Sequence, residues 1–95
     1  MAHTYGVDVI PHSWGTGIAI RAAIHLVANL DPNPGRMRNP LPLLELDRTE
    51  NDLRDVLTGP LLQINPQNGV LKMDWEKPGL GVNVDTVALE KYRIE

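Results

Sequence analysis

The chain has 95 residues, with 9 Lys and Arg against 12 Asp and Glu and no cysteine. This length allows one domain at most, and the net charge of −3 argues against a nucleic-acid-binding surface. Without cysteine the chain has no disulfide framework and no thiolate site. No targeting segment follows Met1, and no apolar stretch reaches the roughly 20 residues of a membrane span. We therefore expect a cytoplasmic protein without a membrane partner.

The first predicted elements are a strand at about Gly6–Ile10 and a helix at about Thr16–Leu30. The first residue of the helix is a candidate N-cap. Arg21, His25 and Asn29 recur every four residues and so form one narrow polar stripe. Because the helix is otherwise apolar, we expect it to lie inside a larger protein or at an interface.

The next predicted elements are a loop, a short strand and a charged segment. Residues 31–42 contain four prolines and a glycine, which predicts a loop. Leu43–Leu46 predicts a short apolar strand. The alternating charges of Asp47–Asp55 predict a solvated surface with one short helical turn. The order strand, helix, strand indicates the α/β class and groups residues 1–58 into one segment.

Residues 59–95 are predicted to form a tail that begins with a β-hairpin. Leu61–Ile64 and Val70–Met73 are its strands, and the loop between them carries an Asn-Gly turn signal. Asp85 is the candidate cap of a final short helix that runs through Tyr92.

Two residues at predicted strand ends are candidates for acid–base chemistry. His12 follows the first strand, and imidazole is a side chain suited to proton transfer. The alternative is a turn histidine that bonds only to backbone. Glu45 interrupts an apolar strand, where a carboxylate is costly unless it is paired, solvated or used. The alternative is a side chain that points outward. Neighbouring strands of a barrel present such residues on one face, which favours considering the two together.

Other polar features give weaker predictions. Trp14 is expected either to line a small-molecule pocket or to plug the end of a barrel. The Gly-x-Gly at residues 15–17 is expected either to hold an anion at a helix start or to allow close helix–strand packing. The three histidines have no ligand-like spacing, so we expect no metal site within this chain.

Several of these residues together resemble the C-terminal end of enolase-superfamily enzymes of the mandelate racemase and muconate-lactonizing enzyme group. The matching elements occur in the same order along nearly the whole chain. They are residues 6–15, the helix rich in Ala and Ile that follows, Leu43-Leu44-Glu45, and Pro78-Gly79-Leu80-Gly81-Val82.

The resemblance implies a modified (β/α)7β TIM barrel beside a capping domain. This chain is then the C-terminal fragment, with the last two strands, the helix between them and a tail that returns toward the cap. Such enzymes abstract a proton α to a carboxylate, and Mg²⁺ stabilises the enediolate that forms. By this likeness His12 is the acid–base residue and Glu45 hydrogen-bonds the substrate carboxylate. Ser13 and Trp14 are further substrate contacts.

The same resemblance implies that the Mg²⁺ ligands, a lysine base and an aspartate that orients the histidine lie upstream of this chain. We therefore expect a truncation, a fragment or a subunit of a split enzyme that is inactive alone. Its partners would be the remaining barrel, the capping domain and an acid-sugar substrate of a dehydratase or racemase. The alternative is a non-catalytic interaction fragment that docks through its apolar helix, on another chain or on itself.

Overall fold

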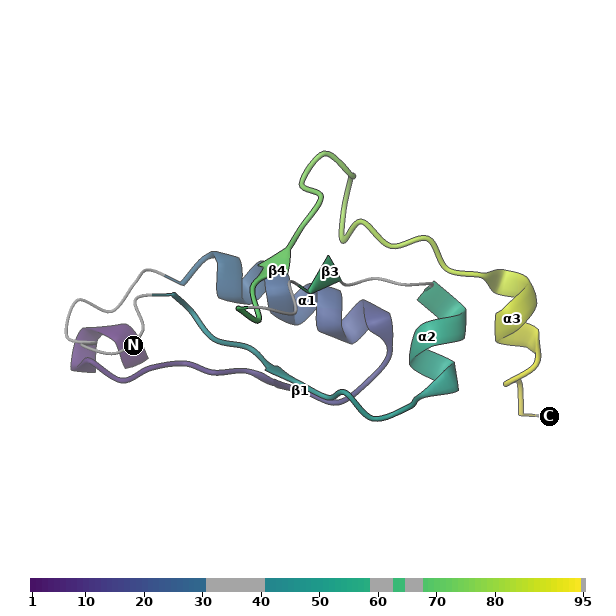
Figure 1. The fold of residues 1–95 in the computed structure, drawn as a ribbon, viewed down its shortest axis with the longest axis horizontal. Coiled ribbons are helices and arrows are strands. Elements are labelled where there is room, and N and C mark those ends of the chain that lie inside the picture. The colour runs from purple at the N-terminus through teal and green to yellow at the C-terminus, as the bar shows by residue number, and fades with distance from the viewer. Residues whose placement is uncertain (31–40, 59–62, 65–67, 95) are drawn as a thin grey trace.

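The structure is a computed structural model that describes residues 1–30, 41–58, 63–64 and 68–94. It has a mixed α/β arrangement (Figure 1). The elements are a 3-10 helix η1 (Ala2–Tyr5), β1 (His12–Ser13), α1 (Gly17–Ala28), β2 (Glu45–Leu46), α2 (Asp52–Thr58), β3 (Gln63–Ile64), β4 (Leu71–Lys72) and α3 (Thr86–Glu90).

The molecule is elongated. Its radius of gyration is 15.4 Å, against the 12–13 Å or so expected for a compact domain of this length. α2 and α3 lie side by side at the end where the C-terminus is found, and the N-terminus lies at the other end (Figure 1). In the described part of the chain, the buried hydrophobic residues are Ile20, Ile24, Leu57 and Ala88. The core is therefore small and centres on one face of α1.

The first strand, the helix and the second strand form a parallel β-α-β unit. β1 pairs with β2 in the register His12↔Glu45 and Ser13↔Leu46. The backbone N–H of Glu45 donates to the carbonyl of Pro11 at 3.2 Å. The pairing confirms the predicted order of elements, and β2 falls inside the predicted 43–46 strand.

The predicted strand at Gly6–Ile10 is wrong in position. The ladder starts only at His12, and the residues before it are outside any strand, with Val7 56% exposed. A β-branched sequence favours extended backbone, but a strand also needs a neighbour to pair with. Among the described residues, the segment that starts at Gly6 and the segment that starts at Leu43 pair only at their carboxyl ends, in β1 and β2.

α1 confirms the predicted helix, with ends that lie inside the predicted bounds. Thr16 occupies the N-cap position but makes no side-chain capping bond. The helix ends at Asn29, whose backbone N–H donates to the carbonyls of Leu26 and Val27. Ile18 and Leu26 are 40% and 53% exposed, so one side of this apolar helix is open.

The polar stripe of α1 faces the tail of the chain. Arg21 is buried, and its Nη1 lies 2.9 Å from the sulfur of Met73. The rings of His25 and Trp75 meet edge to face, with centroids 5.4 Å apart and an interplanar angle of 84°. The stripe therefore packs against the segment that follows β4.

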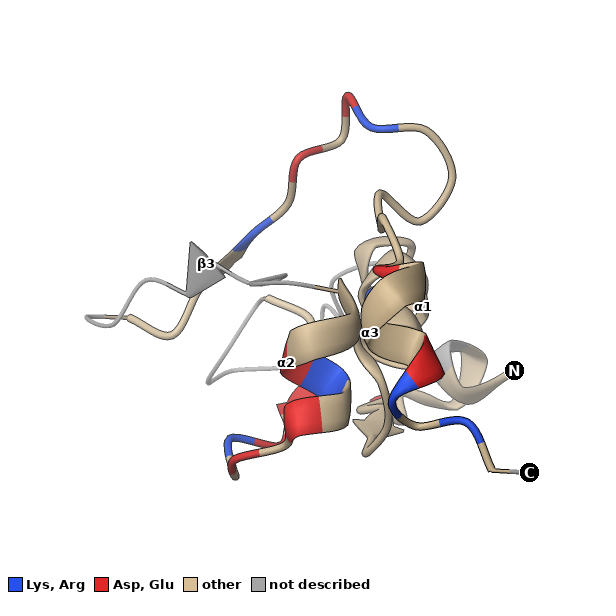
Figure 2. Ribbon diagram, turned by 90° about the vertical axis from the view of Figure 1, so that its right-hand side faces the viewer, with Lys and Arg blue, Asp and Glu red and all other residues tan. Residues whose placement is uncertain are grey.

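The charged segment after β2 is less solvated than predicted. A helix does form there, but α2 begins only at Asp52 and continues to Thr58. Asn51 starts it, because its Oδ1 accepts the backbone N–H of Arg54 at 3.0 Å. The side chains of Asp47 and Arg54 are only 16% and 13% exposed. Figure 2 shows basic and acidic residues adjoining on α2, so opposite charges cover one another.

The tail follows the predicted pattern. β3 and β4 are antiparallel in the register Gln63↔Lys72 and Ile64↔Leu71, which confirms the hairpin. Gly69 has a φ of +68°, as a glycine-dependent turn needs. Of the predicted hairpin, residues 61–62 and 65–67 lie outside the described residues, as does most of the predicted 31–42 loop.

Asp85 caps the last helix, as predicted. Its side chain accepts the backbone N–H groups of Val87 and Ala88, and its own N–H donates to the carbonyl of Leu57 at 2.8 Å. The helix ends at Glu90 rather than Tyr92. The division of the chain after residue 58 stays a prediction. Within the described ranges, no helix combines the length and the apolar character needed to cross a membrane.

Candidate functional site

The structure brings together the two predicted acid–base residues. His12 and Glu45 are register partners on neighbouring parallel strands, so their side chains leave the sheet on the same face. Nδ1 of His12 lies 3.2 Å from Oε2 of Glu45, and the two side chains are 65% and 63% exposed. The structure thus shows an imidazole–carboxylate pair that is open to solvent on two neighbouring parallel strands.

The contact assigns different tasks to the two nitrogens of the imidazole. With Glu45 ionised, the nitrogen that faces it carries the proton and donates to the carboxylate. Nε2 is then the nitrogen that can accept a proton from another molecule or return one to it. An ion pair this exposed contributes little to stability, so its value lies in orienting the ring.

The two predicted substrate contacts differ in exposure. Ser13 is buried and pairs with Leu46. Because side chains alternate along a strand, it leaves the face opposite to His12, and β1 contacts α1. Trp14 follows β1 directly and is 75% exposed. The structure thus places Ser13 away from the pair, and the substrate-binding roles of both residues stay predictions.

Asp47 lies in the charged segment after β2 that was predicted to be solvated. Its Oδ1 accepts the backbone N–H of Thr49 at 2.9 Å and the Thr49 hydroxyl at 2.7 Å. These bonds, the backbone one first, hold the pKa of Asp47 below its usual value, and the charge of Arg54 and the indole N–H of Trp14 add to the effect.

Arg54 connects this segment to α2. Its guanidinium donates to the carbonyl oxygens of Asp47 and Thr49 at 3.1 and 2.7 Å. It also reaches both carboxylate oxygens of Asp55, at 2.8 and 3.1 Å. The hydrogen bond to Arg54 is the main reason why the pKa of Asp55 is lowered. One signal in the sequence could have predicted where α2 starts: Asn51 is a capping residue type three positions before Arg54.

No metal centre is built from the residues described. No group of three or more His, Asp or Glu side chains among them could hold an ion. Glu45 contacts His12, and Asp47 is engaged with Thr49 and Arg54. The described residues therefore form no Mg²⁺ site of their own, and the resemblance puts the ligands upstream of this chain. That cofactor stays a prediction about residues outside this chain.

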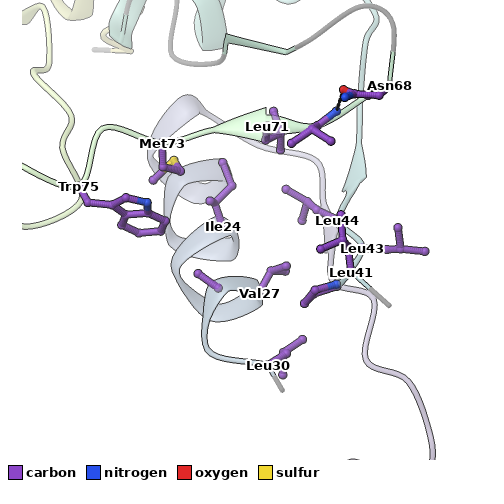
Figure 3. Close-up of a pocket in the computed structure, with 14 residues that line it drawn as sticks. Ile24, Val27, Leu30, Leu41, Leu43, Leu44, Asn68, Leu71, Met73 and Trp75 are labelled. Atoms are coloured by element: carbon purple, nitrogen blue, oxygen red, sulfur yellow. Dashed lines mark hydrogen bonds between the residues drawn. The ribbon is translucent and has the colours of Figure 1, made fainter. Parts of the chain in front are cut away.

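A cavity of about 450 Å³ lies at the opposite end of the β-α-β unit. Figure 3 shows side chains from the end of α1, from the segment before β2 and from the hairpin converging on it. None of the 14 lining residues is titratable, and Asn68 is the one polar side chain besides the indole of Trp75. The cavity is thus unsuited to acid–base chemistry, which leaves the strand ends as the candidate site.

No family model matches the chain, but it is similar to known proteins. The chain is 39% identical over 95 residues to a D-galactarolactone cycloisomerase of Agrobacterium fabrum and covers 24% of it. It is 51% identical to a 3,6-anhydro-D-galactonate cycloisomerase of Zobellia galactanivorans, with a TM-score of 0.78 against the crystal structure and 23% of that protein covered. The chain thus spans about a quarter of the length of these relatives, and both are cycloisomerases.

Proposed function

We propose that this chain is the C-terminal part of an enolase-superfamily enzyme that isomerises a sugar-derived acid. Its two parallel strands and intervening helix would be the last β-α-β unit of a (β/α)7β barrel. The similarity to two cycloisomerases supports this reaction class. The observation that carries the proposal is the 3.2 Å contact between Nδ1 of His12 and Oε2 of Glu45 at the strand ends.

In this function His12 moves a proton at the carbon α to the substrate's carboxylate. Nε2 accepts the proton as the electron pair of the C–H bond passes into the carboxylate, or it delivers a proton to the same carbon in the reverse step. Glu45 holds the ring and balances the imidazolium that forms in the first case. This orienting contact is a second role for Glu45, beside the predicted hydrogen bond to the substrate carboxylate. Glu45 can donate that hydrogen bond only when it is protonated.

The exposure of both side chains supports a site that other polypeptide completes. A general acid or base works best where water is excluded and the substrate is fixed. Here the pair is about two-thirds open. We therefore propose that the isolated chain is inactive and that the remaining barrel and capping domain cover the site. No step is assigned to Mg²⁺, because the described residues do not form its site.

A second candidate is a docking role without catalysis. The open side of α1 carries Ile18 and Leu26, and Val7 is exposed on the segment before β1. Large exposed apolar side chains favour contact with another surface. Sedimentation of the isolated chain tests this candidate. Stable, specific self-association without added polypeptide favours docking between copies of the chain.

The test of the proposed function is a chimera. The matching quarter of the Agrobacterium cycloisomerase is replaced by these 95 residues, and turnover of D-galactarolactone is followed by NMR in D2O. We expect turnover with incorporation of solvent deuterium. His12→Asn and Glu45→Gln each lower kcat, the first by about 10²- to 10⁴-fold as for loss of a general acid or base.

Two matched variants control for the substitution itself. His25→Asn changes the same residue type on the tail side of α1, and Glu76→Gln removes a carboxylate from the exposed tail. Both are expected to retain kcat. A chimera that turns over normally with His12→Asn contradicts the assignment. A folded chimera with no activity, by circular dichroism and size, contradicts the proposal that this segment belongs to such an enzyme.

A further inference from the structure

We propose that Met73 is an oxidation site for peroxides and that the guanidinium of Arg21 binds the sulfoxide that forms. Oxidation then strengthens the contact between the tail and α1, whereas oxidation of a packed methionine usually weakens its surroundings. The inference goes beyond the proposed function and does not depend on it, because neither residue belongs to the pair of His12 and Glu45.

Arg21 presents a charged donor directly to the sulfur of Met73. Its Nη1 lies 2.9 Å from Sδ, and the contact joins residues that are 52 positions apart in the sequence. Arg21 is 7% exposed, so water competes little for this donor. A hydrogen bond from a charged group is about twice as strong as a neutral one, but a thioether sulfur is only a weak acceptor. A stronger acceptor at this place would therefore gain more from the same donor.

The sulfur of Met73 can be reached by a small oxidant. Met73 is half-buried and lines the cavity of about 450 Å³ between α1 and the hairpin. Figure 3 shows its side chain close to the helix, among the residues that surround this cavity. A water molecule occupies about 30 Å³ of the liquid, so the cavity admits a neutral molecule as small as hydrogen peroxide.

The reaction transfers one oxygen atom from hydrogen peroxide to the sulfur. A lone pair of Sδ attacks one peroxide oxygen, and the O–O bond breaks as the S–O bond forms. The hydroxide that leaves takes the proton of the transferred oxygen, which gives the sulfoxide and water. The sulfur is thus oxidised by two electrons and the peroxide is reduced. Methionine has three rotatable side-chain bonds, so the new oxygen can turn toward the guanidinium whichever lone pair reacts.

The sulfoxide oxygen carries negative charge and is a much better acceptor than the thioether sulfur. In an apolar core such an oxygen disrupts packing, because a buried polar group without a hydrogen bond is costly. Beside Arg21 it meets a charged donor instead. The tail therefore stays on the polar stripe of α1, where the ring of Trp75 contacts that of His25 two residues further along.

The experiment uses the 95-residue chain with Met37→Leu, which leaves Met1 and Met73 as its methionines. The folded chain is treated with hydrogen peroxide, and mass spectrometry of its peptides measures the oxygen gained at each residue. We expect oxidation first at Met1, which is fully exposed, and then at Met73. Urea denaturation followed by circular dichroism should show a midpoint that rises by roughly 0.3–0.5 M, the net contribution of one hydrogen bond divided by the m-value of a small protein.

Two substitutions of Arg21 test its part in this rise. Arg21→Leu removes the donor, so oxidation of Met73 should lower the urea midpoint, because the new oxygen then lies in apolar surroundings. Arg21→Lys keeps a charged donor but on a flexible stem, and its midpoint should rise by less than half of the parent's rise. If Arg21→Leu does not fold, the test depends on Arg21→Lys. Met73→Leu is the matched control, and peroxide should leave its midpoint unchanged.

Three results would overturn the inference: a lower midpoint in the oxidised parent chain, the same change in the parent and in the folded Arg21 variants, or a Met73 that stays unoxidised after Met1 is fully converted. A rise that methionine sulfoxide reductases reverse supports it. None of these measurements uses turnover. Failure here therefore leaves the proposed function standing, and an inactive chimera leaves the oxidation site standing.

Discussion

Polar side chains serve different purposes at two places in the described part of this molecule. At the strand ends, His12 and Glu45 touch each other and are otherwise open to solvent. On the tail side of α1, Arg21 and His25 are covered by Met73 and Trp75. The first group keeps free donors and acceptors for another molecule, whereas the contacts of the second hold the tail to the helix. Regular spacing of polar residues on a helix thus marks a contact surface here, whereas the candidate site consists of polar residues that are paired across neighbouring strands.

The largest expected effect on stability comes from a substitution in α1, the helix that both regions share. Ile20 is 1% exposed. Ile20→Ala is expected to lower the free energy of unfolding by about 2–4 kcal/mol, through lost transfer energy and a cavity. Ile18→Ala, on the open side of α1, should cost much less. Urea denaturation followed by circular dichroism measures both. Equal losses at the two positions would show that the open side is covered in solution.

A smaller effect tests how the tail is anchored. Asp85→Ala removes an N-cap that accepts two backbone N–H groups, and a loss of about 1 kcal/mol in unfolding free energy is expected. Thr16→Ala is its control, because Thr16 sits at the N-cap of α1 without a side-chain capping bond. Denaturant midpoints should fall for the first variant and stay near the parent value for the second.

The two tryptophans sharpen the comparison most directly, because one substitution can be made in each region. Trp75→Leu removes the edge-to-face contact with His25 and should cost roughly 0.5–1 kcal/mol of stability, as aromatic pairs contribute. It should leave turnover of the chimera unchanged. Trp14→Leu should instead change turnover of the chimera and leave the stability of the chain unchanged. The idea fails if Trp14→Leu destabilises the chain more than Trp75→Leu does.

Much of this fold follows from local rules that the sequence displays. A run of Ala, Ile and Leu favours a helix, an Asn-Gly loop between apolar stretches predicts a hairpin, and Asp85 is a capping residue type before a helix. Each of these elements depends on neighbours within a few positions. α1, the β3–β4 hairpin and α3 were therefore predictable from the sequence.

The rest depends on residues that are distant in the sequence. Val7 and Ile10 have strand-forming side chains, yet no partner runs beside them in the described part of the chain. Local composition carries no information about where two segments 33 residues apart in register meet, as His12 and Glu45 do. The Arg54 contacts were also not predictable from local composition. Alternating charges predict a solvated segment, and only the turn after β2 brings Asp47 and Thr49 within reach of Arg54.

The smallest expected effect is a dependence of stability on acid pH, and it originates in the carboxylates around Arg54. The folded-state pKa of Asp47 and of Asp55 is lowered below the ordinary value of 3.8. The causes are the Thr49 backbone bond for Asp47 and the Arg54 hydrogen bond for Asp55. A lowered folded pKa means that the unfolded chain binds more protons, so unfolding is favoured as pH falls.

The stabilisation from these two carboxylates is therefore complete above their unfolded pKa, and it is lost as the pH falls through their lower folded values. Urea midpoints measured between about pH 6 and pH 3 should decline at the acid end, and the decline should be shallower in Asp47→Asn. Asp74→Asn, on the tail and outside the Arg54 contacts, is the control and should keep the parent slope. A parent chain whose midpoint does not change over this range would mean that Arg54 does not hold the two carboxylates in solution. Asp47 and Asp55 would then be solvated, as the side chains of His12 and Glu45 are.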